Sequence, residues 1–149
     1  MCKLHHSPLI GSQRALLDRF YRQHSSRMRA TREGDIWVTR DTEIIAGLNL
    51  SPVPGGQWLT GLFVAPSRRG QRIAADLMEA ALNTLNVPTW LFCHPDLEDF
   101  YRRNGFALPD HLPRVLAERL TRYQRSKSLI ALVRVQSSWT SSPGKSTSV

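Results

Sequence analysis

Apolar residues recur every three to four positions in three stretches of this chain, residues 12–24, 71–85 and 111–123. This spacing places them on one face of a helix, so each stretch predicts an amphipathic helix. A fourth, shorter helix is expected over residues 95–106, because Pro95 and acidic residues open it and Asn104-Gly105 closes it. In the first helix, Ser12 is a suitable cap, and the expected buried face comprises Leu16, Leu17, Phe20, Tyr21 and His24.

Runs rich in β-branched and apolar residues predict five strands, over residues 35–40, 43–53, 57–64, 89–93 and 128–135. Asp41-Thr42 separates the first two as a hairpin, and the Pro-Gly-Gly at residues 54–56 makes the next turn. No element is expected before residue 12, and His5 and His6 are interpreted as incidental residues near a floppy terminus.

The predicted order is helix, three strands, helix, strand, helix, helix, strand. This order indicates an α/β (α+β) domain, a mixed central β-sheet flanked by helices. Residues 1–136 are expected to form that domain. Residues 137–149 read SSWTSSPGKSTSV and are expected to be a disordered polar tail, since they bury too little apolar surface to become ordered.

Composition limits the possible classes of protein. The chain has 149 residues, 41% of them hydrophobic, which fits one globular domain. No apolar run approaches the ~20 residues that span a bilayer, and we expect no membrane association and a cytoplasmic location. The two cysteines, Cys2 and Cys93, are too few for a disulfide framework or a metal knuckle.

The formal charge of +8 suggests an anionic partner. Of the 20 basic residues 17 are arginines, with clusters at Arg27–Arg32, Arg68–Arg72 and Arg114–Lys127. A solvated basic surface explains this spread of charge better than nucleic-acid binding does.

Residues 66–78, PSRRGQRIAADLM, run from a basic turn into a predicted helix. A turn of this kind exposes backbone N–H groups at the positive end of the helix dipole, where phosphate binds. Arg68, Arg69 and Arg72 add charge. The stretch has neither the Gly-Lys-Ser/Thr of a nucleotide P-loop nor a three-glycine dinucleotide fingerprint.

The wider pattern LTGLFVAPSRRGQRIAADLMEAAL, followed by FYRRNGF, resembles the GNAT superfamily of acetyl-CoA-dependent N-acetyltransferases over about residues 35–136. The family loop is Arg/Gln-x-x-Gly-x-Gly/Ala after a strand ending in Val-x-Pro. Val64, Pro66, Arg69 and Ala74 match this pattern, whereas Arg72 replaces the middle glycine.

The resemblance implies a binding site for acetyl-CoA built mainly from backbone groups. Leu62, Phe63 and Val64 are expected to bind the pantetheine arm, and a bulge in their strand to point an N–H at the thioester carbonyl. The residues expected to cradle the pyrophosphate are Arg69, Gly70, Gln71, Arg72, Ile73 and Ala74. Arg68 or Arg72 is expected either to reach the 3′-phosphate or to face solvent.

Two further residues receive roles from the resemblance. Tyr101 stands where many family members place the acid that protonates the CoA thiolate; the alternative is that Tyr101 and Phe100 simply pack one helix face. His94 is interpreted as a pantetheine contact or a base, and equally as a polar strand end or helix cap.

The general base is not identified, because no carboxylate lies between Glu43 and Asp76. Three explanations remain open: a water relay, an acid from elsewhere such as Glu33, Asp35 or Glu43, or an amine that binds already neutral. No histidine or cysteine has a second ligand at metal spacing, so no metal is expected.

These observations predict an N-acetyltransferase acting on a small amine or a peptide amine, with acetyl-CoA as co-substrate. One alternative is a non-catalytic CoA-binding or interaction domain of the same fold. The other is an acetyltransferase acting on an RNA-linked amine, suggested by the arginines of residues 114–127. Homodimers are frequent among relatives, so a homodimer is a possible assembly.

Overall fold

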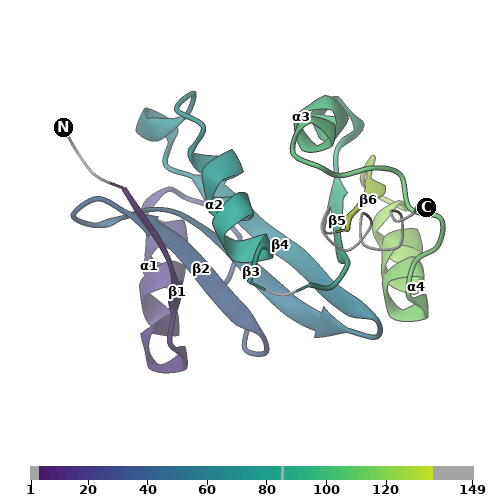
Figure 1. Cartoon of the computed structure of the whole chain (residues 1–149), viewed down its shortest axis with the longest axis horizontal. Helices are drawn as coiled ribbons and strands as arrows, with labels where there is room; N and C mark the ends of the chain where they lie inside the picture. The colour runs from purple at the N-terminus through teal and green to yellow at the C-terminus, as the bar shows by residue number, and fades with distance from the viewer. Residues whose placement is uncertain (1–3, 85, 136–149) are drawn as a thin grey trace, which may run out of the picture. The chain divides into compact units, whose positions relative to one another are not determined.

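The computed structural model describes residues 4–84 and 86–135. Within them the chain forms six strands and four α-helices (Figure 1). The elements are β1 (His5–Leu9), α1 (Arg14–Gln23), β2 (Asp35–Arg40), β3 (Ile44–Val53), β4 (Gly56–Val64), α2 (Ile73–Leu82), β5 (Thr89–Cys93), α3 (Glu98–Arg103), α4 (Arg114–Tyr123) and β6 (Ile130–Arg134). Short 3-10 turns, η1 (Gly11–Gln13), η2 (Pro66–Arg68) and η3 (Pro95–Leu97), precede α1, α2 and α3. The predicted fold class, four helices and five strands are confirmed.

The strands form one mixed sheet in the order β1-β2-β3-β4-β5-β6. β1–β2, β2–β3 and β5–β6 pair antiparallel, whereas β4 and β5 pair parallel at Gln57↔Thr89 and Trp58↔Trp90. By internal contacts, the described residues divide into an N-terminal unit (4–52 and 59–84) and a C-terminal unit (53–58 and 86–135).

The first strand corrects the sequence prediction, which expected no element before residue 12. β1 pairs with β2 in a register that runs from His5↔Arg40 to Leu9↔Ile36. The His6 ring lies 2.8 Å from the Thr39 hydroxyl, so this histidine is part of the sheet. The segment HHSPL has no apolar alternation, and its Pro8 is acceptable only because β1 is an edge strand. Its pairing is supplied by β2, which local sequence does not reveal.

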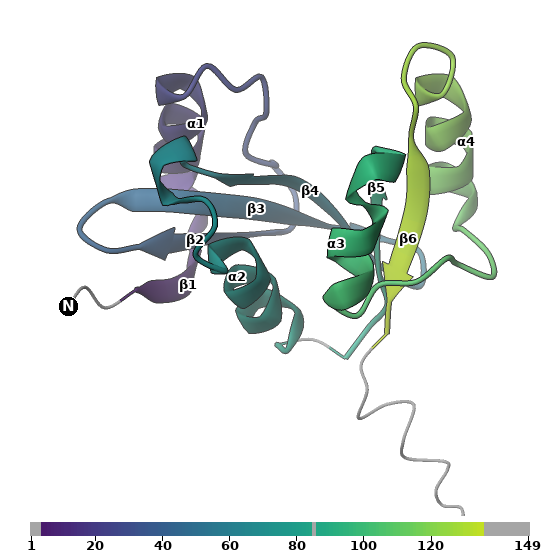
Figure 2. The same cartoon turned by 90° about the horizontal axis from the view of Figure 1, so that it is seen from above.

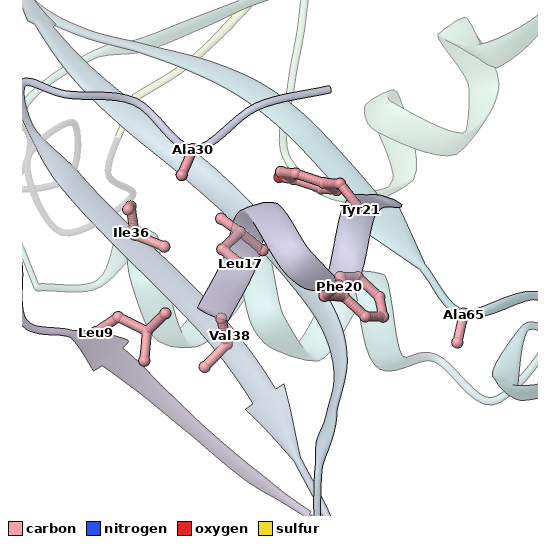
Figure 3. Close-up of a cluster of buried hydrophobic side chains, with 8 residues drawn as sticks. All are labelled: Leu9, Leu17, Phe20, Tyr21, Ala30, Ile36, Val38 and Ala65. Atoms are coloured by element: carbon pink, nitrogen blue, oxygen red, sulfur yellow. The ribbon is translucent and has the colours of Figure 1, made fainter. Parts of the chain in front are cut away.

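The core of the N-terminal unit forms where α1 packs on the strands. Leu17, Phe20 and Tyr21 are almost completely buried, whereas Leu16, expected on the same face, is 39% exposed. The cluster drawn in Figure 3 comprises Leu9, Leu17, Phe20, Tyr21, Ala30, Ile36, Val38 and Ala65. α1 and α2 lie on opposite faces of β1–β3 (Figure 1, Figure 2). The β1–β3 part of the sheet is therefore covered on both sides.

The C-terminal unit is held together by β5, β6 and a group of aromatic rings. Trp58 and Phe92 have ring centroids 5.4 Å apart, and the Arg119 guanidinium lies 4.9 Å from the Trp58 ring centroid. Phe92 in turn packs edge-on against Tyr123 of α4. These contacts fix α4 on its strands.

None of the helices among the described residues is long and apolar enough to cross a bilayer. The polar tail predicted over 137–149 lies outside the described residues.

Candidate functional site

The segment that joins β4 to α2 has two residues in the left-handed region. Gly70 has φ +82, and Arg72 has φ +61 and ψ +16. A left-handed residue cannot continue a right-handed helix, so α2 begins at Ile73 and not at residue 71 as the sequence predicted. Arg72 occupies the N-cap position, where its backbone turns the chain into the helix.

Six consecutive backbone N–H groups in this segment have no acceptor among the described residues. They belong to residues 70–75, and the first bond of the helix runs from the Asp76 N–H to the Arg72 carbonyl over 2.9 Å. A helix normally leaves its first four N–H groups unpaired, here those of residues 72–75, and the loop extends this series backwards by two residues, Gln71 and Gly70. The space over Gly70 is open, with no atom within 4 Å of the position of an added Cβ. We name residues 70–75 the amide cradle.

Arg68 is not directed at a ligand but fixes the loop to the protein. Its guanidinium Nη1 lies 2.5 Å from the Asp41 carboxylate in the β2–β3 turn, and both side chains are largely buried. The hydrogen bond from Arg68, together with those from the Thr42 and Glu43 N–H groups, holds the pKa of Asp41 well below its usual range. The sequence left two roles open to Arg68, contact with the 3′-phosphate or exposure to solvent. Its ion pair with Asp41 corresponds to neither.

Arg69 is also used within the protein. Its Nε donates a hydrogen bond of 3.0 Å to the Val64 carbonyl, and its guanidinium lies 5.1 Å from the centroid of the Phe63 ring. The side chain therefore folds back onto the end of β4, and the Arg69 N–H donates to the Pro66 carbonyl over 3.5 Å, so neither belongs to the unpaired donors of the amide cradle.

Arg72 faces solvent. Its side chain is 78% exposed, and its closest charged partner is Asp76, 3.8 Å away. Replacing the glycine of the family pattern by Arg72 thus puts a residue with a Cβ into a left-handed conformation, whereas its exposed side chain fills no buried space.

β4 departs from regular extended geometry at Gly61, which has φ +67. The Tyr21 hydroxyl donates a hydrogen bond of 2.6 Å to the Gly61 carbonyl. An added Cβ at Gly61 would lie 2.5 Å from Asn49 Nδ2 and 2.7 Å from the Tyr21 hydroxyl. Glycine is therefore required here by both conformation and space.

Asn49 connects this irregularity to the α1–β2 connection. Its side chain is 1% exposed; Oδ1 accepts from the Thr31 N–H over 2.9 Å, and Nδ2 donates to the Arg29 carbonyl over 3.0 Å. Burial raises the pKa of Tyr21 well above its usual range, although its hydrogen bond with Asn49 opposes this effect. Tyr21 therefore remains a protonated donor.

Sequence reasoning placed Tyr21 only on a helix face and gave Asn49 no role. The available signal was Asn49 itself, a polar residue inside the apolar run IIAGLNL, because a buried amide needs partners. The partners, which are 18 and 20 residues away, could not be identified from that signal.

In the C-terminal unit, Tyr101 lies on α3 and is 9% exposed. Its ring packs against Phe100 and Phe106, with centroids 5.0 and 5.7 Å away. Burial raises the pKa of Tyr101 to about 12, and the neighbouring Cys93 thiol adds to the rise. The aromatic packing predicted as one interpretation is present, and the phenol keeps the proton that an acid must carry.

His94 follows β5 and caps η3. Its Nδ1 accepts a hydrogen bond of 3.0 Å from the Asp96 N–H, so its predicted role as a helix cap is confirmed. Its predicted contact with a pantetheine arm stays a prediction.

The loop, the Gly61 irregularity and Tyr21 thus lie in the N-terminal unit, whereas Tyr101 and His94 lie in the C-terminal unit. The three acids considered as general bases, Glu33, Asp35 and Glu43, are all exposed. Across residues 4–84 and 86–135, no group of three or more His, Cys, Asp or Glu side chains is arranged to hold a metal ion.

Comparison with known proteins gives a family match. The profile of the acetyltransferase (GNAT) domain matches residues 32–108. No curated protein matches the chain by sequence.

Solved structures resemble the chain in fold. A GNAT family N-acetyltransferase (YhbS) from Escherichia coli in complex with CoA aligns with a TM-score of 0.67 at 19% identity, over 91% of this chain and 82% of that one. Escherichia coli ElaA aligns with a TM-score of 0.63 at 17% identity, over 87% of this chain and 99% of that one. An acyl-CoA N-acyltransferase from Pseudomonas aeruginosa aligns with a TM-score of 0.62 at 19% identity, over 89% and 100%. At these identities the likeness shows the fold.

Proposed function

This chain belongs to the acetyltransferase (GNAT) family, and we propose that it transfers an acetyl group from acetyl-CoA to a primary amine. Acetyl-CoA supplies an activated thioester carbonyl. In the transfer a C–N bond forms to the amine and the thioester C–S bond breaks; the amine loses one proton and the departing thiolate gains one.

The observation that carries this proposal is the amide cradle. Six unpaired N–H groups, the positive end of α2 and the open space over Gly70 suit a group with several anionic oxygens. A pyrophosphate has such oxygens, and the structural relative YhbS was solved in complex with CoA. We assign residues 70–74 to the pyrophosphate, with the Arg69 backbone leading into them.

Backbone groups of Leu62, Phe63 and Val64 are proposed to hold the pantetheine arm. The Val64 carbonyl already accepts from Arg69, which fixes the strand end without using an N–H of β4. The left-handed turn at Gly61 lies directly before these residues and is held by Tyr21. We propose that this irregularity aims a backbone N–H at the thioester oxygen, where it stabilises the developing negative charge.

Tyr101 is proposed to protonate the thiolate. A phenol whose pKa is about 12 is fully protonated near neutral pH and therefore always able to donate. His94, which caps η3, is proposed as a further contact of the pantetheine arm. The cytoplasmic location and the homodimer stay predictions.

The RNA-linked acceptor receives less support than a small amine. In the basic stretch of residues 114–127, Arg114 pairs with Glu118, Arg119 lies over Trp58 and Lys127 lies over Tyr123. These cations already have partners within the C-terminal unit.

The test is a calorimetric titration of acetyl-CoA into the full chain and two glycine variants. Gly70→Ala places a Cβ in the open space of the amide cradle, whereas Gly55→Ala imposes the same strain at φ +84 in the β3–β4 turn. We expect both to destabilise the fold by about 1 kcal/mol, and only Gly70→Ala to weaken acetyl-CoA binding, by at least tenfold. If acetyl-CoA does not bind to the unmodified chain, the proposed acetyltransferase activity is ruled out, and an interaction domain that does not bind CoA is favoured.

A further inference from the structure

A cavity of about 530 Å³ lies at the C-terminal end of α1 in the N-terminal unit. It is lined by Asp18, Arg22, Ser26, Arg27, Met28 and Arg29. Nothing in the mechanism above uses it.

The charge of the lining is strongly biased. Three arginines and a single acid line the cavity, and Asp18 uses its Oδ1 to accept a hydrogen bond of 2.7 Å from the Ala30 N–H. Among the described residues, Arg22, Arg27 and Arg29 form no ion pair, in contrast to Arg68 and Arg102. Free guanidinium groups present paired donors that match carboxylate and phosphate oxygens.

The position of the cavity relative to β4 is fixed by hydrogen bonds. The carbonyl of Arg29, a lining residue, accepts a hydrogen bond from Asn49 Nδ2, and the same nitrogen lies 2.5 Å from the point where a Gly61 Cβ would stand. Tyr21, one residue before Arg22, donates to the Gly61 carbonyl. Hydrogen bonds therefore connect the wall of the cavity, at Arg29, to the strand irregularity to which the proposed function assigns the thioester oxygen.

We propose that this cavity binds the anionic group, a carboxylate or a phosphate, of the amine acceptor. This inference rests on the proposed acetyl transfer and narrows its acceptor to amines that carry such an anion. The same arginines disfavour polycationic amines, because like charges repel.

The arginines also explain how an acceptor loses its proton without a carboxylate base. In an amino acid or a phosphorylated amine, the anionic group holds the proton on the neighbouring ammonium group. Guanidinium groups that neutralise the anion favour the neutral amine, which is the nucleophile. The proton then leaves to water, and no acid among Glu33, Asp35 and Glu43 is required.

The experiment compares matched amines on the full chain. The pairs are β-alanine with β-alaninamide and O-phosphoethanolamine with ethanolamine, assayed by acetyl-CoA-dependent thiol release. We expect the anionic member of one pair to be preferred at least tenfold in kcat/KM, and the preferred pair identifies carboxylate or phosphate. Arg27→Gln and Arg29→Gln should lower that preference by roughly tenfold each. Arg125→Gln, an exposed arginine of the C-terminal unit, is the control and should leave it unchanged.

Measuring the binding of anionic probes to the cavity tests this inference independently of the proposed acetyl transfer. Saturation-transfer NMR on the full chain would use N-acetyl-β-alanine, N-acetyl-O-phosphoethanolamine and their uncharged counterparts as probes. Arginine-dependent binding of one anionic probe supports the cavity even if acetyl-CoA does not bind, in which case only the proposed function fails. Equal binding or equal turnover of charged and uncharged members, or no effect of Arg27→Gln and Arg29→Gln, would overturn the inference.

Discussion

The Tyr21 hydroxyl of α1 donates a hydrogen bond of 2.6 Å to the Gly61 carbonyl of β4. The two residues are 40 positions apart, and the bond holds the strand at the point where its backbone turns left-handed. The Tyr21 side chain of α1 thereby stabilises the local shape of β4, the strand that is proposed to bind the thioester of acetyl-CoA.

Tyr21→Phe removes this donor and leaves the buried carbonyl without its partner. We expect the free energy of unfolding to fall by about 1–2 kcal/mol. Gly61→Ala should cost more, because its Cβ meets Asn49 and the tyrosine hydroxyl at under 3 Å. Urea denaturation measures both, and Gly11→Ala, with no atom within 4 Å of its Cβ position, is the control. Stability of Gly61→Ala equal to that of the control would contradict the requirement for glycine.

Arg72→Gly and Arg72→Ala separate backbone strain from charge. Both remove the guanidinium, but alanine keeps a Cβ at φ +61. We expect the glycine variant to be more stable than the alanine variant by about 1 kcal/mol, as measured by denaturation. Both should bind acetyl-CoA roughly two- to fivefold more weakly at low salt, because an exposed charge beside the cradle contributes little. Tighter binding by the glycine variant than by the unmodified chain would instead mean that the Cβ obstructs the site.

Asp41→Asn tests the anchor between the β2–β3 turn and η2. A carboxylate whose pKa is lowered on folding stabilises the protein above its unfolded pKa, about 3.9, and this contribution is lost as pH falls towards the folded pKa. We therefore expect the variant to be less stable at pH 7 and the difference to narrow below about pH 4. Denaturation at a series of pH values measures this. Asp110→Asn, an exposed acid, is the control, and a difference that does not change with pH would argue against the ion pair.

Tyr101→Phe removes the proposed acid and keeps the ring that packs on Phe100 and Phe106. We expect turnover to fall by roughly 100-fold or more, whereas the affinity for acetyl-CoA and the thermal midpoint should stay near those of the unmodified chain. Thiol-release kinetics and calorimetry measure the two effects. Unchanged turnover would leave Tyr101 with packing as its only role.

The sequence predicted most of the fold because periodicity and turn residues are local signals. Five strands and four helices follow from them. β1 was missed because His5–Leu9 lacks alternation and depends on β2 for its pairing. The start of α2 was misplaced because Arg72 gives no local sign that its backbone is left-handed.

Less of the site could be predicted. The loop and Tyr101 were predicted as site residues because they match spaced motifs, and these roles stay predictions. The supporting contacts, Tyr21 with Gly61 and Arg68 with Asp41, join residues 40 and 27 positions apart. Such pairs are set by how the strands and helices pack, and no short pattern in the chain encodes them.

The amide cradle has a consequence for mutational mapping. Its donors are main-chain groups, so an alanine substitution such as Gln71→Ala would leave every N–H in place and would not report on the contacts that these donors make. Single amide-to-ester replacements, introduced by semisynthesis, would delete one donor at a time and reveal the contribution of each. Because main-chain donors do not depend on the side chain, the proposed phosphate contacts are compatible with an arginine at position 72, where the family pattern has glycine.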